Sequence, residues 1–350
     1  MHERRPLATI VIVNYNYGKF VADAIDSALT QSYEPLEVIV VDDGSTDNSR
    51  QVISTYDKRV RIVFQDNGGQ GSAYNAGWRA ARGDFVLYLD SDDVLRPDAI
   101  AKTAEAFRRS DAVKVQFYLA QTDRNLEPLG FLLPSYPFSR LGPREQITNY
   151  GYYVSPPASG NAYRKSFLDE IMPIANVELY RNAADGYTTG LAGLAGHIES
   201  IPETLGYYRI HGDNFGGEGG VLTIQRLHHM FMRDIKREDS EHAFGGHFNF
   251  HFLPDRSRYC PGHTKLRLLS RRMQPDAHPI KTDKISYLVA GGVVSAFKFP
   301  HLKLTKRVGV ALGFIVMGLV PRSMLRTHFD AIVSPQKRNR TVSGKLLLNA

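Results

Sequence analysis

Cysteine is almost absent from this chain of 350 residues, in which Cys260 is the only one. One cysteine cannot form an intrachain disulfide, which is typical of a protein from a reducing compartment. No stretch reaches the roughly 20 consecutive apolar residues that a membrane-spanning helix needs. The apolar run at residues 7–13 is too short for a signal peptide, so we expect neither a leader nor a spanning segment.

Two phosphate-binding motifs are also missing from the place where they would be expected, after the first apolar run. Residues 13–18 read VNYNYG. This matches neither the G-x-G-x-x-G of dinucleotide-binding folds nor the G-x-x-x-x-G-K-[ST] of nucleoside triphosphatases. We therefore exclude both classes of nucleotide-binding protein.

The composition that remains is that of a globular protein, with 43% hydrophobic and 23% charged residues. A chain of this length can form one large domain and a smaller appendage. The formal net charge of +7 is uneven, because residues 301–350 hold nine Lys or Arg residues and one acid, Asp330.

Strands and helices alternate over the first 110 residues. Apolar, β-branched runs predict strands at residues 8–13, 36–41, 60–64 and 85–89. Helical spacing and capping residues predict helices at 18–31, 47–55, 70–82 and 97–109. This order predicts an α/β fold, with a Rossmann-like, mostly parallel sheet and helices on both faces.

Three carboxylates follow the fourth predicted strand and precede Pro97: Asp90, Asp92 and Asp93. In open α/β sheets ligands bind where strands end. Crowded carboxylates repel one another unless a cation neutralises them, and hard oxygen ligands suit Mg²⁺ or Mn²⁺ shared with substrate phosphates. The alternative is a solvated acidic turn that caps the next helix.

Polar residues follow the second and third predicted strands as well. Asp42 and Asp43 precede Gly44, and an acid there can accept hydrogen bonds from a base imide or a ribose hydroxyl. The glycine-rich residues 67–71 and the following Asn75 favour close backbone approach to an anionic ligand at a helix N-terminus. The alternatives are simple helix capping and a flexible surface loop.

Four segments at successive strand ends, VIVNYN, VVDDGSTDNS, NGGQGSAYNAG and YLDSDD, together resemble glycosyltransferase family 2. The resemblance is dense over residues 8–98 and thinner to about residue 215. It implies a GT-A fold and transfer of a sugar from a nucleotide sugar with inversion. It also implies six nucleotide-binding residues: Val13, Tyr15, Asp42, Asp43, Asn75 and Asp90.

The same resemblance implies the metal site and the base. Asp90 and Asp92 correspond to the D-x-D pair that touches ribose and metal, and His211 to a histidine near the metal or pyrophosphate. Asp185 corresponds to the catalytic base at the head of a helix, although Ala184 stands where many members have a preceding Glu. The alternatives are a capping role for Asp185 and a structural role for His211.

The remaining sequence is less regular. Residues 112–121 predict a strand, and the proline-rich residues 125–157 predict loops that line an acceptor site. His247, His251 and Asp255 have a spacing that could hold zinc, but nearby Gly and Pro residues argue against it. Residues 285–299 and 308–320 are apolar with basic flanks, which predicts either helices in a membrane interface or a packed helical hairpin.

We therefore expect a catalytic domain at residues 1–215, with a nucleotide-binding half at about 8–110 and an acceptor half at about 111–215. A mainly helical region at 216–350, with a membrane-associated role as one option, would follow. The expected partners are a UDP-linked sugar donor, a glycan or lipid-linked acceptor and an anionic membrane surface, with Mn²⁺ or Mg²⁺ as cofactor and no nucleic acid.

The expected function is inverting glycosyl transfer in bacterial polysaccharide or glycan biosynthesis. The expected location is the cytoplasm or the cytoplasmic face of a membrane. Two alternatives stay open. A nucleotidyltransferase would need a basic, glycine-rich loop after the first strand, where residues 14–19 offer only Lys19. A non-catalytic partner in polysaccharide assembly would keep the fold without turnover.

Overall fold

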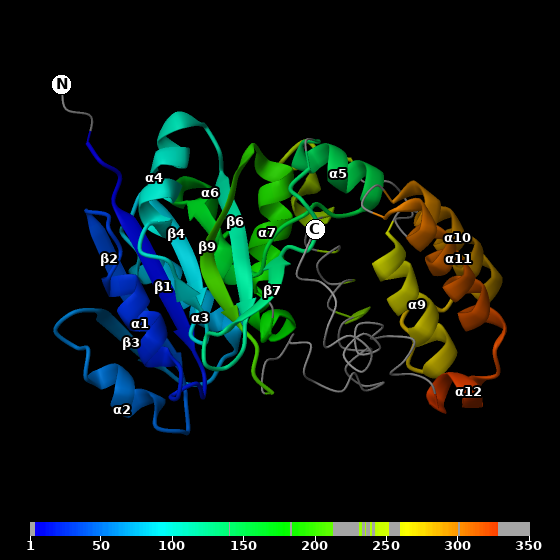
Figure 1. Cartoon of the computed structure of the whole chain (residues 1–350), viewed down its shortest axis with the longest axis horizontal. Helices are drawn as coiled ribbons and strands as arrows, with labels where there is room; N and C mark the ends of the chain where they lie inside the picture. The colour runs from blue at the N-terminus through cyan, green and yellow to red at the C-terminus, as the bar shows by residue number, and fades with distance from the viewer. Residues whose placement is uncertain are drawn as a thin grey trace. The chain divides into compact units, whose positions relative to one another are not determined.

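The computed structural model describes residues 4–139, 141–182, 184–212, 231–232, 235, 239, 242–251, 260–299 and 302–327. The chain divides into two compact units (Figure 1). The first comprises Met1–Ile147, Tyr152–Gly219 and Asp239–His251, and the second Thr148–Gly151, Gly220–Glu238 and Phe252–Ala350. Each unit is made of three separate stretches of sequence, so no single boundary in the chain separates the two units.

A nine-stranded sheet organises the first unit, in the order β3-β2-β1-β4-β8-β6-β9-β5 with β7 paired to β6. Its first four strands pair in parallel with one another and lie at the predicted places: β1 (Ala8–Asn14), β2 (Leu36–Asp43), β3 (Arg61–Gln65) and β4 (Phe85–Asp90). The α/β fold with a Rossmann-like first half is therefore confirmed.

The second half of the sheet is mixed. It contains β5 (Val94–Leu95), β6 (Lys114–Thr122), β7 (Pro128–Leu133), β8 (Asn161–Arg164) and β9 (Ile198–Arg209). β8 runs antiparallel to both β4 and β6, whereas β9 runs parallel to β6. Parallel pairing thus dominates only the N-terminal half, where helices connect successive strands.

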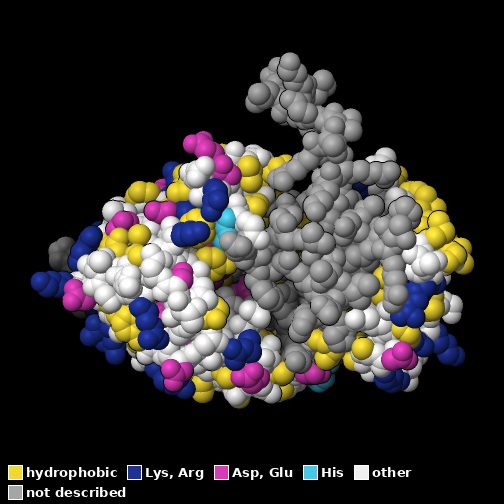
Figure 2. Space-filling view, turned by 90° about the horizontal axis from the view of Figure 1, so that it is seen from below, with side chains coloured by type: hydrophobic (Ala, Val, Ile, Leu, Met, Phe, Trp, Pro, Cys, Tyr) yellow, Lys and Arg dark blue, Asp and Glu magenta, His cyan; other side chains and the backbone are white. Residues whose placement is uncertain are grey.

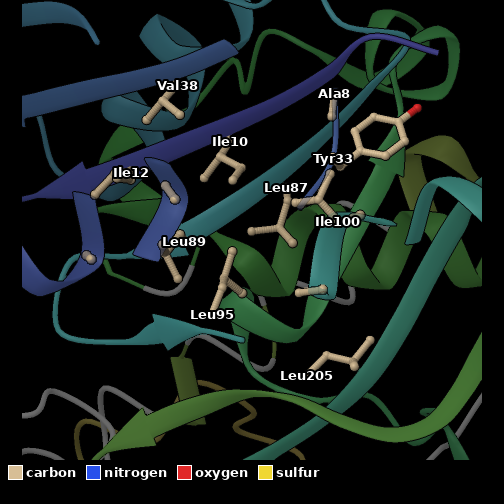
Figure 3. Packing of buried hydrophobic residues seen from close by; sticks show 14 of the residues in the cluster. Ala8, Ile10, Ile12, Tyr33, Val38, Leu87, Leu89, Leu95, Ile100 and Leu205 are labelled. Atoms are coloured by element: carbon tan, nitrogen blue, oxygen red, sulfur yellow. The ribbon is translucent and has the colours of Figure 1, made fainter. Parts of the chain in front are cut away.

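Helices cover both faces of the N-terminal half. The helices α1 (Val21–Leu29), α2 (Ser49–Ser54) and α4 (Ala99–Arg109) contribute to one core with alternate residues of β1 and its neighbours (Figure 3). On the other face α3 (Gln70–Ala80) lies against β1 so closely that a Cβ on Gly77 would come within 2.4 Å of Val11 Cγ1. The two-residue period of β1 therefore serves two helical layers.

The prediction of loops at residues 125–157 was wrong in two places. β7 begins at Pro128 and, among the strands that the structure describes, pairs only with β6, an edge position where a missing N–H is tolerated. The helix α5 (Pro143–Tyr150) begins at a proline, which is favourable in a first turn.

Two helices and two 3₁₀ turns complete the part of the first unit that surrounds the strand ends. They are η1 (Ala158–Gly160), α6 (Lys165–Ile171), η2 (Val177–Tyr180) and α7 (Asp185–Ala195). The predicted helix head at Asp185 is confirmed, because α7 begins at this residue.

The second unit contains α9 (Pro261–Met273), α10 (Ile285–Lys298), α11 (Leu304–Leu319) and α12 (Arg322–Thr327). Leu268, Met273, Leu288, Phe314 and Met317 belong to its core. A Cβ on Gly292 would meet Phe314, and one on Gly318 would meet Val289, so α10 and α11 are antiparallel. Within the described ranges, no helix combines the length and apolar character needed to cross a membrane.

Candidate active site

The polar residues that end β1, β2 and β4 lie at one edge of the sheet. Strand register places Asn14 opposite Asp42 and Val13 opposite Asp90. Just beyond β1, the Tyr15 side chain is 46% exposed, while Val13 is half-buried. An aromatic ring and an aliphatic side chain thus stand beside the acidic strand ends, in positions suited to contact a planar base.

Asp42 is fully buried and its carboxylate is occupied within the protein. It accepts hydrogen bonds from Asn14 Nδ2 at 2.8 Å, Ser45 Oγ at 2.5 Å and Arg50 Nε at 3.0 Å. These contacts join the end of β2 to the end of β1, to the loop after β2 and to α2. The geometry therefore gives Asp42 a role in shaping the site, and its contact with a nucleotide stays a prediction.

Asp43 anchors the glycine-rich loop that precedes α3. Its carboxylate accepts hydrogen bonds from Gly68 N at 2.9 Å, Gly69 N at 2.7 Å and Gln65 Nε2 at 2.6 Å. Gly69 has φ +83°, and a Cβ there would meet the backbone of Arg181 at 2.5 Å, so the position requires glycine. The loop is held on both sides, which contradicts the alternative of a flexible surface loop.

The structure gives Asn75 a structural role in place of the predicted ligand contact. The residue is buried in α3, where its Nδ2 donates to Ile174 O at 3.0 Å and its Oδ1 accepts from Ile174 N at 2.8 Å. Both ends of the amide are therefore engaged by one backbone segment, far along the sequence. A direct contact of Asn75 with the nucleotide does not fit this geometry.

Asp93, whose role the sequence left open, connects three segments. Its carboxylate accepts from Ser159 Oγ at 2.6 Å and from Arg209 N at 3.0 Å. Ser159 Oγ in turn accepts from Asp90 N at 3.1 Å. The acidic turn after β4 is thus fixed to η1 and to the end of β9, which contradicts the alternative of a solvated acidic turn.

The carboxylates of this turn interact unfavourably with one another. Burial raises the pKa of Asp90 well above its ordinary value, and the charges of Asp92 and Asp185 raise it further. Burial, Asp92 and Asp90 likewise raise the pKa of Asp93. Gln70 Nε2 donates to Asp90 Oδ1 at 3.4 Å and offsets only part of the effect. A bound cation would relieve this repulsion.

His211 lies beside the D-x-D pair. Its Nε2 atom is 3.0 Å from Asp92 Oδ2, and both side chains are almost fully buried. The imidazole stacks on Phe20 at 4.6 Å between ring centroids and meets Tyr17 edge-on at 5.3 Å. The structure therefore brings together two of the three predicted metal ligands and fixes the histidine ring by aromatic packing.

The residues present fit Mg²⁺ or Mn²⁺ better than zinc. Within the described part of the chain, no group of three His, Cys, Asp or Glu side chains is arranged to hold a metal by itself. Mg²⁺ is typically held by one or two carboxylates together with substrate phosphates and water. Asp90 and Asp92 could provide the two carboxylates. His247 pairs instead with Glu170 at 3.6 Å, and Asp255 lies outside the described residues.

Gln70 joins the D-x-D turn to the head of α7. While its Nε2 atom donates to Asp90, its Oε1 atom accepts from Ala184 N at 2.8 Å, one residue before Asp185. Among the residues that the structure describes, no side chain caps α7 at Ala184, and Asp185 is half-buried in the first turn. The predicted base therefore lies near the predicted metal-binding pair, although the two are separated by a long stretch of sequence.

Sequence reasoning missed three residues of this site. Gln70 lies in the segment NGGQGSAYNAG, but its contacts with Asp90 and Ala184 depend on tertiary structure. Ser159 bridges Asp90 and Asp93, and a serine carries no periodic signal. Lys114 on β6 is fully buried, with Nζ donating to Gln116 Oε1 at 3.0 Å, Tyr153 OH at 3.1 Å and Ser155 Oγ at 2.7 Å.

The fold is similar to that of a solved structure. It resembles the crystal structure of residues 1–349 of S. aureus TarS in complex with UDP, with a TM-score of 0.50 and 15% identity. The likeness covers 97% of this chain and 94% of the other, and at this identity it concerns the fold alone. It agrees with the predicted GT-A type of α/β fold.

Sequence comparison then points to a family. Residues 9–171 match the sequence model described as Glycosyl transferase family 2, so this part of the chain is similar to that family. An uncharacterized glycosyltransferase of Nostoc sp. is 38% identical over 211 residues, which is 59% of this chain and 65% of the relative.

Two named synthases are similar over shorter stretches. Chondroitin synthase of Escherichia coli is 35% identical over 150 residues, 42% of this chain and 21% of its own length. Hyaluronan synthase of Pasteurella multocida is 39% identical over 133 residues, 37% of this chain and 13% of its own length. The chain thus spans less than two thirds of the length of each of these relatives.

Proposed function

We propose that this protein transfers a sugar from a UDP-linked donor to a hydroxyl acceptor, with inversion, in the assembly of a bacterial polysaccharide or glycan. The bridge through Gln70 carries the proposal, because it joins the D-x-D turn to the helix head bearing Asp185. The names of the two synthases support polysaccharide assembly. The UDP bound to the S. aureus protein of similar fold supports the choice of nucleotide.

In the proposed site Val13 and Tyr15 would contact the base, and Asp43 would accept a hydrogen bond from its edge, as the family resemblance implies. Asp90 and Asp92 would hold Mn²⁺ or Mg²⁺ together with the donor diphosphate, and His211, whose Nε2 lies 3.0 Å from Asp92 Oδ2, would position the Asp92 carboxylate. When bound, the cation supplies positive charge that stabilises the departing UDP. The same positive charge would also relieve the repulsion between the carboxylates of Asp90 and Asp92.

Asp185 is the proposed general base. It takes the proton from the acceptor hydroxyl as that oxygen attacks the anomeric carbon, and the glycosidic bond to UDP breaks on the opposite side. Single displacement of this kind needs a carboxylate on the acceptor side and no protein nucleophile on the donor side. The position of Asp185 in the first turn of α7 suits a carboxylate, because the helix N-terminus favours negative charge.

The first test is a panel of UDP-sugars, assayed for transfer and slow hydrolysis with Mn²⁺ and with EDTA. With the UDP-sugar that the parent protein uses, Asp185→Asn should lower kcat about 10²–10⁴-fold, because the amide cannot accept a proton. The dissociation constant for UDP should hardly change, since the proposed nucleotide contacts lie at the ends of β1, β2 and β4 and not on α7. Glu178→Gln, which changes an exposed acid of η2, is the matched control and should keep parental activity.

Retention of the parental rate by Asp185→Asn would remove the base assignment. Turnover of a nucleoside triphosphate and a sugar phosphate would favour the nucleotidyltransferase alternative. Donor binding without transfer or hydrolysis across the panel would favour a non-catalytic partner.

A further inference from the structure

The helix α11 exposes a continuous apolar face. Its exposed apolar side chains recur every three or four residues along one side: Leu304, Val308, Leu312, Ile315, Val316 and Leu319. Leu304 is 70% exposed, Leu312 54% and Leu319 79%. Isolated exposed leucines are ordinary, but a row of this length along one helix marks an interaction surface.

The neighbouring helix α10 adds to this surface with exposed Tyr287, Val294 and Phe297. The opposite sides of α10 and α11 are already used, since Gly292 fits against the buried ring of Phe314. The exposed residues are therefore surplus to the core of the second unit. Yellow side chains gather at the right-hand end of Figure 2, the end at which Figure 1 shows α10 and α11.

The charge on this segment has one sign only. Residues 284–327 contain four lysines and three arginines but no Asp or Glu. The four lysines, Lys284, Lys298, Lys303 and Lys306, are exposed, and three of them lie at or near the connection between α10 and α11. Residues 308–321 carry no charge at all.

We propose that the exposed apolar face of the α10–α11 hairpin lies in the interface of a membrane that contains anionic lipid. The apolar side chains would enter the boundary between headgroups and acyl chains while the lysines contact lipid phosphates. Because the cytoplasmic leaflet carries the negative surface potential, the proposal places the protein on that side. The inference concerns an attachment surface and does not depend on the proposed catalysis.

Charge argues for lipid over a second copy of the chain. A symmetric dimer through this face would bring lysines of one copy towards those of the other, without an acid in residues 284–327 to pair with them. Like charges facing each other oppose association. An anionic lipid surface supplies the missing negative charge.

The test is flotation of the full-length protein with vesicles of phosphatidylcholine alone or with 40% phosphatidylglycerol. The parent should float with the anionic vesicles at 50 mM salt and much less at 500 mM salt or with neutral vesicles. Leu312→Asp with Leu319→Asp should lower the partition coefficient at least tenfold. Phe131→Asp, which changes a 62% exposed residue on β7, is the matched control and should bind like the parent.

The charge contribution is tested separately. Lys303→Glu with Lys306→Glu should weaken binding, by about fivefold for each positive charge lost. Lys58→Glu with Arg59→Glu makes the same change in net charge at exposed positions of the first unit and should have a much smaller effect. Circular dichroism and Tm would verify that each variant is folded. We expect folded variants, because the altered side chains are exposed.

Three outcomes would overturn the proposal. One is a parent that stays unbound with anionic vesicles at low salt. The second is equal binding by the parent and the Leu312→Asp, Leu319→Asp variant. The third is a parental dimer that this variant converts to a monomer without loss of vesicle binding, which would assign the face to a protein interface.

Discussion

Lys114 is fully buried, which is unusual for a lysine. Three oxygen atoms surround its buried Nζ, and one of them belongs to Tyr153, whose hydroxyl donates to Thr189 O in α7 at 2.7 Å. Burial lowers the pKa of the Lys114 amine well below its ordinary value, and the Asp185 carboxylate opposes this only in part. The amine thus lies between β6 and the helix that carries the proposed base.

This environment predicts a pH dependence of stability. In the unfolded chain Lys114 binds a proton up to a pH of about 10.4, while the folded chain releases it at a lower pH. The unfolded state therefore binds more protons between the two pKa values, and stability rises with pH, by at most about 1.4 kcal/mol per pH unit. In Lys114→Met this contribution should be absent, so the free energy of unfolding should rise less between pH 7.5 and 9.5.

Urea unfolding at several pH values measures the difference. The matched control is Lys58→Met, because the side chain of Lys58 is exposed and its loss should leave the parental pH slope unchanged. At pH 7.5 Lys114→Met should also lose about 1–3 kcal/mol, since Gln116 Oε1 is left buried without its donor. Parallel pH curves for the parent and Lys114→Met would show that the amine is equally protonated in both states.

At the scale of elements, glycine has opposite roles in α10 and α11. Gly292 allows the two helices to approach, because a Cβ there would come within 2.1 Å of the Phe314 ring. Around Gly313, by contrast, no described atom outside the adjacent residues and the backbone of α11 itself lies within 4 Å of an added Cβ. Both residues are interior to their helices, so they differ in packing and share the intrinsic cost of glycine in a helix.

Alanine substitution should therefore change stability in opposite directions. Gly313→Ala should stabilise the second unit by roughly 0.5–1 kcal/mol through helix propensity. Gly292→Ala gains the same propensity but forces the buried Phe314 ring to move, and should destabilise by about 1–3 kcal/mol. Thermal unfolding followed by circular dichroism gives both values, and a rise in Tm for Gly292→Ala would contradict the close packing of α10 on α11.

The elements that the sequence predicted well are those with local signals. Strands β1 to β4 are short apolar runs bounded by turns, and α1, α3 and α4 have apolar residues at helical spacing. β7 and α5 were missed because their prolines read as loop signals, although Pro128 begins an edge strand and Pro143 a first helical turn. The antiparallel insertion of β8 between β4 and β6 depends on contacts between distant segments and has no local signal.

In the site, too, the residues with a local sequence signal could be predicted, and those positioned by contacts between separate segments could not. The positions of Asp90, Asp92 and Asp185 could be predicted because each stands at or just after a strand end or at the head of a helix within a recognisable segment, and their chemical roles stay predictions. The positions of Gln70 and Ser159 in the site could not be predicted, since Gln70 links Asp90 to Ala184 and Ser159 links Asp90 to Asp93, and these hydrogen bonds join residues 20 to 114 positions apart. Asn75 was assigned wrongly to the ligand side because its segment resembles the family, while its amide faces the backbone of Ile174.

At the scale of the whole molecule, the first unit collects negative charge where a donor diphosphate would bring more. Asp90 and Asp93 already carry raised pKa values that reflect burial and mutual repulsion. A diphosphate bound without a cation would add to this repulsion. The proposed function therefore requires that nucleotide and cation bind together, which is a thermodynamic coupling between two ligands.

The coupling can be measured without turnover. For the parent, Mn²⁺ should tighten the binding of UDP by roughly 5–150-fold, and UDP should tighten the binding of Mn²⁺ by the same factor, because coupling is reciprocal. In Asp92→Asn one charged oxygen ligand is replaced by a neutral amide, so the coupling should fall towards unity while the fold is kept. Asp111→Asn, which changes an exposed aspartate outside the site, should keep the parental coupling. Calorimetric titration of UDP with Mn²⁺ or EDTA measures each factor. If the parent binds UDP equally well in Mn²⁺ and in EDTA, the acidic turn after β4 holds no cation for the donor, and Asp90 and Asp92 must serve the nucleotide by other means.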